Sequence, residues 1–402
     1  MFDLDKFIGK YVTKRPKSMF LQDIENNKDE LSKKIRGKTV LVVGGAGSIG
    51  SSFIKAILPF KPTALVVVDT NENALAELTR DLRATKGMYV PEDYIPYPMD
   101  FSSPVFEKMF RQRGGFDIVG NFSAHKHVRS EKDIYSVESL LQNNVLHAKL
   151  LLDLLTEFPP EEYFCVSTDK AANPVNIMGA SKRIMEDIIF SYSDKFPVKT
   201  ARFANVAFSN GSLPAGFIAR LQKLQPLSAP SDVKRYFVSP EESGQICMLA
   251  CMLGKNREIF FPRLEEEQMM TFDKIATALL DEYGYEVLQC ESDAEAIDKS
   301  DALKQGCNQY PVHYSGSDTS GEKAYEEFYT DTETADLNRF RALGVVTNKS
   351  VPDREKVKIL FKELNTTFEK EETSKEEVIS IMKAYLPNFE HIETGKSLDS
   401  KM

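Results

Sequence analysis

Short apolar runs alternate with longer amphipathic segments through the middle of the chain. The runs occupy residues 38–45, 64–70, 94–100, 116–124, 163–169 and 199–206. Runs that are apolar at nearly every position are typical of parallel strands buried on both faces, and helical spacing between them predicts covering helices. The alternation therefore predicts an α/β fold with a doubly wound parallel sheet.

The pattern changes on both sides of this region. A helix over 239–254 and a strand over 258–262 are predicted to return to the sheet after the last run. The far C-terminal part is charge-rich with one amphipathic helix, which fits either an oligomerisation arm or a loosely held appendage. We divide the chain into an N-terminal helical extension, a Rossmann domain, a smaller substrate lobe with returning Rossmann elements, and a C-terminal helical extension (1–36, 37–206, 207–345 and 346–402).

Three glycines, Gly44, Gly47 and Gly50, follow the first strand and precede a helix in the stretch GGAGSIGSSF. Glycines at this spacing allow a tight turn and close backbone approach to a pyrophosphate. The start of the helix, at Ser48 and Ile49, offers free N–H groups and the positive end of the helix dipole. The sequence therefore predicts a dinucleotide site of the Rossmann type.

Two aspartates are candidates for the adenosine half of that dinucleotide. Asp69 ends the second strand, nineteen positions beyond Gly50. A carboxylate there accepts hydrogen bonds from the ribose hydroxyls and repels a 2′-phosphate, and no arginine follows directly, so NAD is favoured over NADP. Asp100 closes the third strand and either contacts the adenine edge or forms an ordinary turn.

The glycine spacing resembles that of the extended short-chain dehydrogenase/reductase superfamily, whose active site carries Tyr-x-x-x-Lys after the fifth strand. In the segment STDKAANPVNIMGASKR, Lys182 occupies the lysine position and Met178 the tyrosine position. Because methionine does not ionise, the usual base of the superfamily is absent.

The residues around this position resemble the UDP-N-acetylglucosamine 4,6-dehydratases of polysaccharide biosynthesis, and most closely their subgroup with methionine in place of tyrosine. Three further stretches are similar to segments of that family: AHKHV (124–128), RFANV (202–206) and SGEKAYEEF (320–328). The resemblance covers about residues 38–345, in the order of the family.

This resemblance implies NAD-dependent loss of water from a UDP-N-acetylhexosamine, UDP-N-acetylglucosamine first, giving a 4-keto-6-deoxy sugar nucleotide. The chemistry needs an acid and a base, and we assign Lys170 as the base at C5 and Asp169 as the acid at the C6 oxygen. Both must titrate nearer neutral pH than usual, which burial can bring about. Thr168 would bond the C4 oxygen. The proton of the C4 hydroxyl then goes to Asp169 directly, or to Lys182 or solvent through Thr168.

The resemblance also suggests substrate contacts. Lys126 and His127 follow the fourth strand and either line the site or form a solvated basic turn. Asn205 and Arg235 are candidates for the UDP diphosphate, because an amide and a guanidinium both suit phosphate oxygens. Arg235 is preferred to the neighbouring Lys234.

Departures from the family pattern fall on the substrate side. Ala204 replaces a glycine, Asn210 stands where an arginine is usual, and residues 262–272 are unusually acidic. These departures affect the predicted identity of the sugar more than the predicted type of reaction.

Composition limits the classes of partner. The net charge of −9 argues against nucleic acid, which needs a clustered basic surface. The five cysteines lie in apolar or mixed surroundings, which favours buried thiols in a reduced cytoplasmic protein over a metal site. No apolar run approaches the ~18 residues of a membrane span. A homodimer or higher homo-oligomer is expected from the superfamily.

Two other functions compete with dehydration. A related sugar-nucleotide epimerase or reductase would share the fold, but simple C4 epimerases depend on the missing tyrosine. A non-catalytic NAD-binding regulatory protein would bind the cofactor without turnover, and Met178 is the best argument for it.

Overall fold

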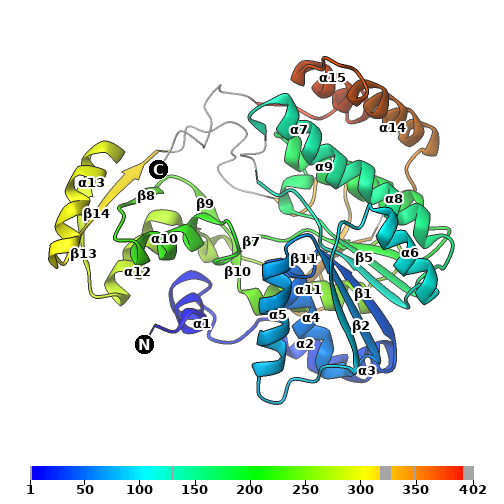
Figure 1. The fold of residues 1–402 in the computed structure, drawn as a ribbon, viewed down its shortest axis with the longest axis horizontal. Coiled ribbons are helices and arrows are strands. Elements are labelled where there is room, and N and C mark those ends of the chain that lie inside the picture. Colours follow the sequence, from blue (N-terminus) through cyan, green and yellow to red (C-terminus); the bar gives the residue numbers. More distant parts are fainter. Residues whose placement is uncertain (1, 128–130, 317–326, 348, 393–402) are drawn as a thin grey trace.

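A nine-stranded sheet forms the centre of the computed structural model, which describes residues 2–127, 131–316, 327–347 and 349–392 (Figure 1). Its strands are β1 (Thr39–Val43), β2 (Ala64–Asp69), β3 (Asp93–Pro98), β4 (Ile118–Asn121), β5 (Glu162–Val166), β6 (Val198–Ala201), β11 (Ile259–Pro262), β15 (Ala335–Asp336) and β16 (Leu343–Val346). They lie in the order β15-β16-β11-β6-β5-β4-β1-β2-β3. Strands β1 to β6 and β11 pair in parallel, whereas β15 and β16 are antiparallel at one edge.

The strand order places the winding reversal between β1 and β4, because the chain runs from β1 to β3 on one side and then crosses to β4. Doubly wound folds bind ligands at the carboxyl ends of the strands beside this point. The predicted fold class is confirmed. The sixth strand is shorter than predicted, because residues 202–206 leave the sheet and form the separate short strand β7 (Asn205–Val206).

Alternate residues of each central strand enter two different apolar cores. Leu41 and Val43 of β1 face one core, and Val40 and Val42 face the other. The first face is covered by α6 (Pro104–Arg113), α7 (Ile134–Leu141), α8 (His147–Leu155), α9 (Ile177–Ser191), α14 (Arg354–Phe368) and α15 (Lys375–Tyr385). The second is covered by α2 (Leu21–Asn26), α3 (Lys28–Ile35), α4 (Ser48–Ile57), α5 (Glu72–Ala84) and α11 (Pro240–Leu253). Burial on both faces explains why the strands read as continuous apolar runs.

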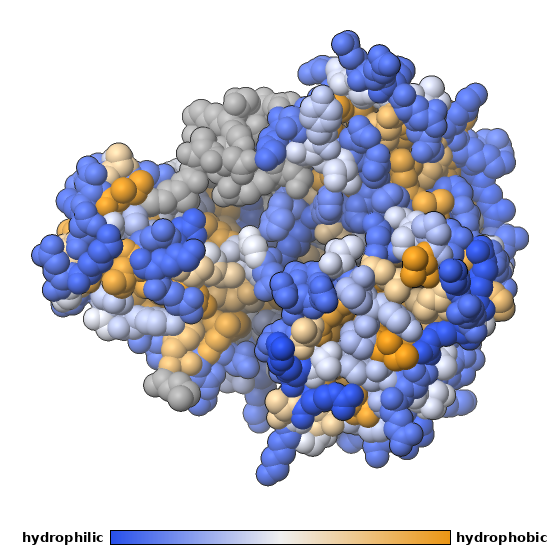
Figure 2. Space-filling model, in the orientation of Figure 1, coloured by the Kyte–Doolittle hydropathy of each residue, from blue (hydrophilic) through white to orange (hydrophobic). Residues whose placement is uncertain are grey.

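A smaller lobe stands beside the sheet, and the surface is hollowed between the two (Figure 2). Its elements are α10 (Leu213–Gln222), β8 (Leu227–Pro230), α12 (Phe272–Glu282), β13 (Glu286–Cys290), α13 (Asp293–Lys299) and β14 (Gln309–Ser315). Two short strand pairs connect it to the sheet domain: β7 with β10 (Phe237–Val238), and β9 (Lys234–Arg235) with β12 (Met270–Thr271).

Both terminal extensions are part of the folded body. At the N-terminus, α1 (Leu4–Phe7) and the π-helical turn η1 (Ile8–Val12) pack into the core of the smaller lobe, which the polar sequence did not indicate. At the C-terminus, α14 and α15 pack on α9 through buried residues such as Leu364 and Met382. A loosely held appendage is therefore excluded. None of the helices in the described part of the chain is long and apolar enough to cross a membrane.

A buried ion cluster holds the ends of two central strands. The guanidinium of Arg202, directly after β6, donates to Glu186 of α9 over 2.6 and 2.8 Å and to Glu333 over 2.6 and 3.0 Å. The Ser167 hydroxyl, directly after β5, donates to Glu186 over 2.7 Å, and Lys349 lies 2.8 Å from Glu333. These five residues, the Arg202 cluster, join β5, β6 and α9 to the segment around Glu333.

The two carboxylates of the Arg202 cluster stay ionised although they are buried. Burial opposes ionisation of Glu333, but hydrogen bonds and charge from Arg202, together with the charge of Lys349, lower its pKa to about 2. Burial likewise opposes ionisation of Glu186, and Arg202 outweighs it and lowers the pKa.

We expect Glu333→Gln to destabilise the fold at pH 7 by about 2–3 kcal/mol, because it leaves Arg202 with less compensation for its buried charge. The pKa of Glu333 is depressed from 4.5, so its contribution is present above pH 4.5 and is lost as the pH falls toward 2. Urea unfolding of the wild type and of Glu333→Gln at pH 7 and pH 3 should show a smaller difference in the free energy of unfolding at pH 3. The control is Glu107→Gln in the exposed Glu107–Arg111 pair, expected to cost under about 1 kcal/mol. A pH-independent difference would contradict the assignment.

Candidate active site

The glycine loop between β1 and α4 is packed so tightly that two of its glycines admit no side chain. Gly44 has φ of +71°, and a Cβ there would lie 2.5 Å from the backbone nitrogen of Ser123. A Cβ at Gly50 would lie 2.4 Å from the carbonyl oxygen of Gly44. Gly47 is the N-cap of α4 and supplies no side-chain cap, so the helix start is open to an anion. These residues fit the pyrophosphate of a dinucleotide.

Asp69 and Asp100 have different roles around this loop. Asp69 ends β2 and accepts hydrogen bonds of 3.0 Å from the N–H groups of Ala46 and Asn71, so it ties the glycine loop to β2. Asp100 accepts bonds from the N–H and hydroxyl of Ser102 within its own turn, at 2.7 and 2.8 Å. The sequence left two roles open for Asp100, a contact with the adenine edge and an ordinary turn. The observed hydrogen bonds favour the turn.

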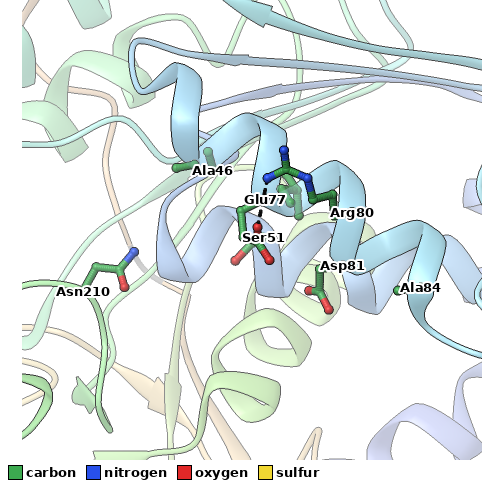
Figure 3. A pocket seen from close by; sticks show the side chains of 9 residues that line it. Ala46, Ser51, Glu77, Arg80, Asp81, Ala84 and Asn210 are labelled. Carbon is green, nitrogen blue, oxygen red and sulfur yellow. Dashed lines mark hydrogen bonds and ion pairs between the residues drawn. The ribbon is translucent and has the colours of Figure 1, made fainter. Parts of the chain in front are cut away.

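A surface cavity of about 570 Å³ lies next to the glycine loop, between α4 and α5 (Figure 3). Ala46 and Asn210 line the end near the loop, and Glu77, Arg80 and Asp81 of α5 line the rest. Its walls are mostly helix side chains, which include charges of both signs, and Gly44, Gly47 and Gly50 are not among the residues that line it. We therefore do not assign the cofactor to it.

Two further loops meet in front of the glycine loop. The N–H of Asn210 donates to the Ser48 hydroxyl over 2.9 Å, and the Lys126 ammonium donates to the Asn210 carbonyl over 2.8 Å. The His127 ring lies against Gly211, where a Cβ would be 2.9 Å from its Nε2. Lys126 and His127 are thus held beside the predicted cofactor loop. Desolvation lowers the pKa of Lys126, although the residue as a whole is exposed.

Thr168, Asp169 and Lys170 form a compact group directly after β5. A single carboxylate oxygen, Oδ1 of Asp169, lies 2.7 Å from the Thr168 hydroxyl, 2.9 Å from the Lys170 N–H and 3.3 Å from the Lys170 ammonium. The Asp169 side chain is 3% exposed and that of Lys170 is 19% exposed. The buried carboxylate and the partly exposed ammonium therefore form an ion pair directly after β5.

Met178 and Lys182 lie one turn apart on α9. Met178 is 3% exposed and packs in the apolar core, while the Lys182 ammonium is buried and donates to the Val166 carbonyl over 3.2 Å. Burial lowers the pKa of Lys182, against the opposing influence of Cys165 and Glu186. Lys182 therefore lies close to the end of β5, from which Thr168 and Asp169 follow.

Two residues that the sequence analysis did not single out fix the start of α9. The Glu131 carboxylate accepts the N–H groups of Ile177 and Met178 at 3.0 and 2.8 Å. Asn144 lies in the π-helical turn η4 (Gln142–Leu146), and its amide donates to the Ser181 hydroxyl over 3.0 Å. A carboxylate 46 positions before its partner has no local sequence signal, so only the fold reveals it.

The C-terminal extension also reaches this helix start. The Lys375 ammonium donates to the Glu131 carbonyl over 2.8 Å, and the His391 ring lies 3.8 Å from the Glu131 carboxylate. The backbone N–H of Ile392 donates to the Val175 carbonyl. His391 is thus part of the contact that holds the start of α9.

Asn205 and Arg235 are brought together by the short strands. The N–H of Asn205 bonds the carbonyl of Tyr236, the residue after Arg235, over 3.1 Å. Arg235 is 5% exposed and its guanidinium bonds the Lys234 carbonyl. Of the stretch SGEKAYEEF, residues 320–326 lie outside the described residues.

Comparison with known proteins identifies the family. The polysaccharide biosynthesis protein family matches residues 40–347. The chain belongs to this family, which is of the extended short-chain dehydrogenase/reductase type. That assignment confirms the resemblance to the polysaccharide-biosynthesis family, whereas membership of the subgroup with methionine in place of tyrosine stays a prediction.

Individual relatives are distant. The chain is 27% identical over 361 residues to the uncharacterized membrane protein MJ1061 of Methanocaldococcus jannaschii, covering 88% of this chain and 98% of that protein. It is 28% identical to the probable polysaccharide biosynthesis protein EpsC of Bacillus subtilis, over 76% of this chain but only 47% of EpsC. It is 24% identical to a UDP-N-acetylglucosamine 4,6-dehydratase (inverting) of Campylobacter jejuni, over 63% of this chain and 74% of that enzyme.

Among solved structures, Pen from Bacillus thuringiensis is similar with a TM-score of 0.63 at 19% identity, over 82% of this chain and 98% of Pen. Such a likeness shows a common fold.

We expect Lys182→Met to leave the melting temperature at pH 7 unchanged or higher, because it removes a buried ammonium. The pKa of Lys182 is lowered from 10.5. The stability of the wild type should therefore rise as the pH approaches 10.5, and the stability advantage of the variant over the wild type should shrink over the same range. Differential scanning calorimetry between pH 7 and pH 10 measures this, with the exposed Lys195→Met as control. A loss above about 1 kcal/mol would mean that the bond to Val166 outweighs desolvation.

Proposed function

We propose that this protein catalyses the 4,6-dehydration of a UDP-N-acetylhexosamine, UDP-N-acetylglucosamine first, with bound NAD. One observation carries the proposal: Asp169 and Lys170 form a half-buried acid–base pair directly after β5, beside a helix that keeps the lysine of the superfamily but has methionine for its tyrosine. Simple alcohol oxidation has no use for a second acid–base pair, whereas elimination of water requires one. The relative named as a UDP-N-acetylglucosamine 4,6-dehydratase supports this reading.

The cofactor site in this proposal uses Gly44, Gly47 and Gly50 for the turn, and Ser48 and Ile49 at the start of α4 for the pyrophosphate. Asp69 holds the adenosine ribose and disfavours a 2′-phosphate, which selects NAD over NADP. Lys182 would bond the nicotinamide ribose from beneath the end of β5. NAD, when bound there, supplies a reversible hydride acceptor for C4 of the sugar.

The proton chemistry belongs to the chain itself. The Lys170 amine removes the C5 proton, and the Asp169 carboxyl protonates the C6 oxygen, which leaves as water. Asp169 gives the C6 oxygen the proton that it took from the C4 hydroxyl, while Lys170, whose ammonium lies 3.3 Å from Asp169, keeps the C5 proton and returns a proton to C5 when hydride returns to C6. The Thr168 hydroxyl already donates to Asp169, which supports Asp169 as the acceptor of the C4 hydroxyl proton through Thr168. Asn205 and Arg235 hold the diphosphate, and Lys126 and His127 line the sugar.

The decisive test is incubation of the protein with UDP-N-acetylglucosamine in deuterated water, followed by proton NMR. We expect a new C6 methyl signal and deuterium at C5. Asp169→Asn and Lys170→Met should each lower turnover by at least about 10²-fold, while Asp301→Asn on an exposed turn leaves it unchanged. Turnover of Asp169→Asn at the wild-type rate would refute the assignment. Bound NAD without turnover of a panel of nucleotide sugars would favour the non-catalytic regulatory protein.

A matched pair of glycine variants tests the cofactor site. A Cβ at Gly47 would meet only the Gly44 carbonyl oxygen, at 3.4 Å, so Gly47→Ala should fold normally and weaken NAD binding by about tenfold where the backbone approaches the pyrophosphate. Gly44→Ala should unfold at markedly lower temperature, because its Cβ would clash with Ser123. Thermal melting and NAD titration separate the two effects. Wild-type NAD affinity in a folded Gly47→Ala variant would argue against this loop as the pyrophosphate site.

A further inference from the structure

Residues 205–212, which include β7 and lead into α10, contact both ligand sites of the proposed function; we call them the β7–α10 segment. Asn205, at its start, is the residue assigned to the UDP diphosphate, and its N–H donates to the Tyr236 carbonyl over 3.1 Å. Asn210, five positions later, donates from its backbone N–H to the hydroxyl of Ser48, the first residue of α4, over 2.9 Å. One short stretch of chain therefore joins the substrate side to the cofactor loop.

The middle of the β7–α10 segment is anchored in the smaller lobe. Phe208 is 9% exposed, belongs to the apolar core of that lobe, and meets the Phe7 ring edge-on at 5.8 Å. Its φ is +54°, a value that a non-glycine residue rarely adopts unless its surroundings fix it, and Gly211 has φ of +75°. The N–H of Ala207 donates to the Val238 carbonyl over 2.9 Å. With its middle fixed in this way, the two ends of the segment are expected to move together.

The cofactor end of the segment is held by contacts at the surface. The Lys126 ammonium donates to the Asn210 carbonyl over 2.8 Å, and a Cβ at Gly211 would lie 2.9 Å from Nε2 of His127. Asn210, Lys126 and Gly211 are exposed, and Ser48 is half-buried. Hydrogen bonds that compete with water contribute little to stability, so these contacts by themselves hold the segment weakly.

A ligand at either site would strengthen the hold on this segment. Ala46 of the glycine loop and Asn210 line the same cavity, so the segment lies directly beside the loop (Figure 3). A pyrophosphate at the start of α4 would exclude water from the bond between Ser48 and Asn210, and a hydrogen bond shielded from water is stronger. A diphosphate bound by Asn205 would fix the other end. The first ligand then bears the entropic cost of ordering the segment, and the second binds to a segment already in place.

We propose that NAD and the UDP-sugar bind cooperatively, and that the bridge formed by Ser48, Asn210 and Lys126 couples their sites through the β7–α10 segment. This inference rests on the function proposed above, because it uses the cofactor and diphosphate sites of that function. The hydride taken from C4 has to return to C6 of the same sugar. Tighter binding of the cofactor while the sugar is present keeps the reduced cofactor in place until that return.

Isothermal titration of the full-length protein with UDP, with and without saturating NAD, measures the coupling after any bound cofactor has been removed. UDP is the probe because it carries the diphosphate and cannot turn over. We expect NAD to raise the affinity for UDP at least about fivefold, the lower end of the usual range for coupled sites. Because coupling of binding is reciprocal, titration with NAD with and without saturating UDP should give the same factor.

Two variants break the bridge at different points. Ser48→Ala removes the acceptor of the Asn210 bond and keeps the backbone N–H groups at the start of α4, so it should lower the coupling factor below about twofold. Its affinity for NAD without UDP should stay within about threefold of the wild type, because only an exposed hydrogen bond is lost. Lys126→Met removes the donor to the Asn210 carbonyl and should also lower the coupling factor. The control is Ser51→Ala on α4, whose hydroxyl bonds the Ser48 carbonyl within the helix and which should keep the wild-type factor.

The outcomes separate this inference from the proposed function. If NAD leaves the affinity of the wild type for UDP unchanged or lowers it, the inference is overturned while the proposed function stands, since both ligands still bind. A coupling factor of wild-type size in both Ser48→Ala and Lys126→Met would also overturn it, because the bridge would then not carry the coupling. Absence of UDP binding to the NAD-bound wild type would overturn the inference and the proposed function together.

Discussion

The buried pairing of Arg202 with Glu186 and Glu333 is the constraint on which the candidate site depends. A guanidinium with no exposed surface is tolerated in a protein core only when every donor meets an acceptor, so the elements that supply those acceptors cannot move independently. They are α9 and the segment around Glu333, and Ser167 adds the end of β5. The cluster therefore holds the end of β5, which leads into the Asp169–Lys170 pair, against α9, which carries Met178 and Lys182.

Residues from distant parts of the chain also hold the start of α9 in place. Glu131 accepts the first N–H groups of the helix, and the C-terminal extension contacts Glu131 through Lys375 and His391. If the tyrosine of the superfamily stood at position 178, this helix would have to orient its side chain. With methionine there, the helix still positions Lys182, whose costly burial at the end of β5 fits the contact with the nicotinamide ribose that we propose.

Both terminal extensions contribute residues to the apolar cores of the protein. The C-terminal helices cover α9, and the N-terminal turn forms a wall of the smaller lobe and links it to α11 through Arg15 and Glu242. The loops that carry Ser48, Lys126 and Asn210 join across the space between lobe and sheet. The proposed catalytic segment, the cofactor loop and the substrate side are thereby held at fixed positions relative to one another. A reaction with two hydride transfers and an elimination would need such fixed positions.

The sequence by itself determined the sheet, the glycine loop and the Thr168–Asp169–Lys170 group. Each of these depends on local order: continuous apolar runs, glycines at fixed spacing, and residues adjacent in the chain. Only the tertiary structure decided the partners of Arg202, the cap that Glu131 places on α9 and the docking of both extensions. Some of those contacts join residues more than 200 positions apart. The sequence around a charged residue does not indicate which distant group will neutralise it once the chain has folded.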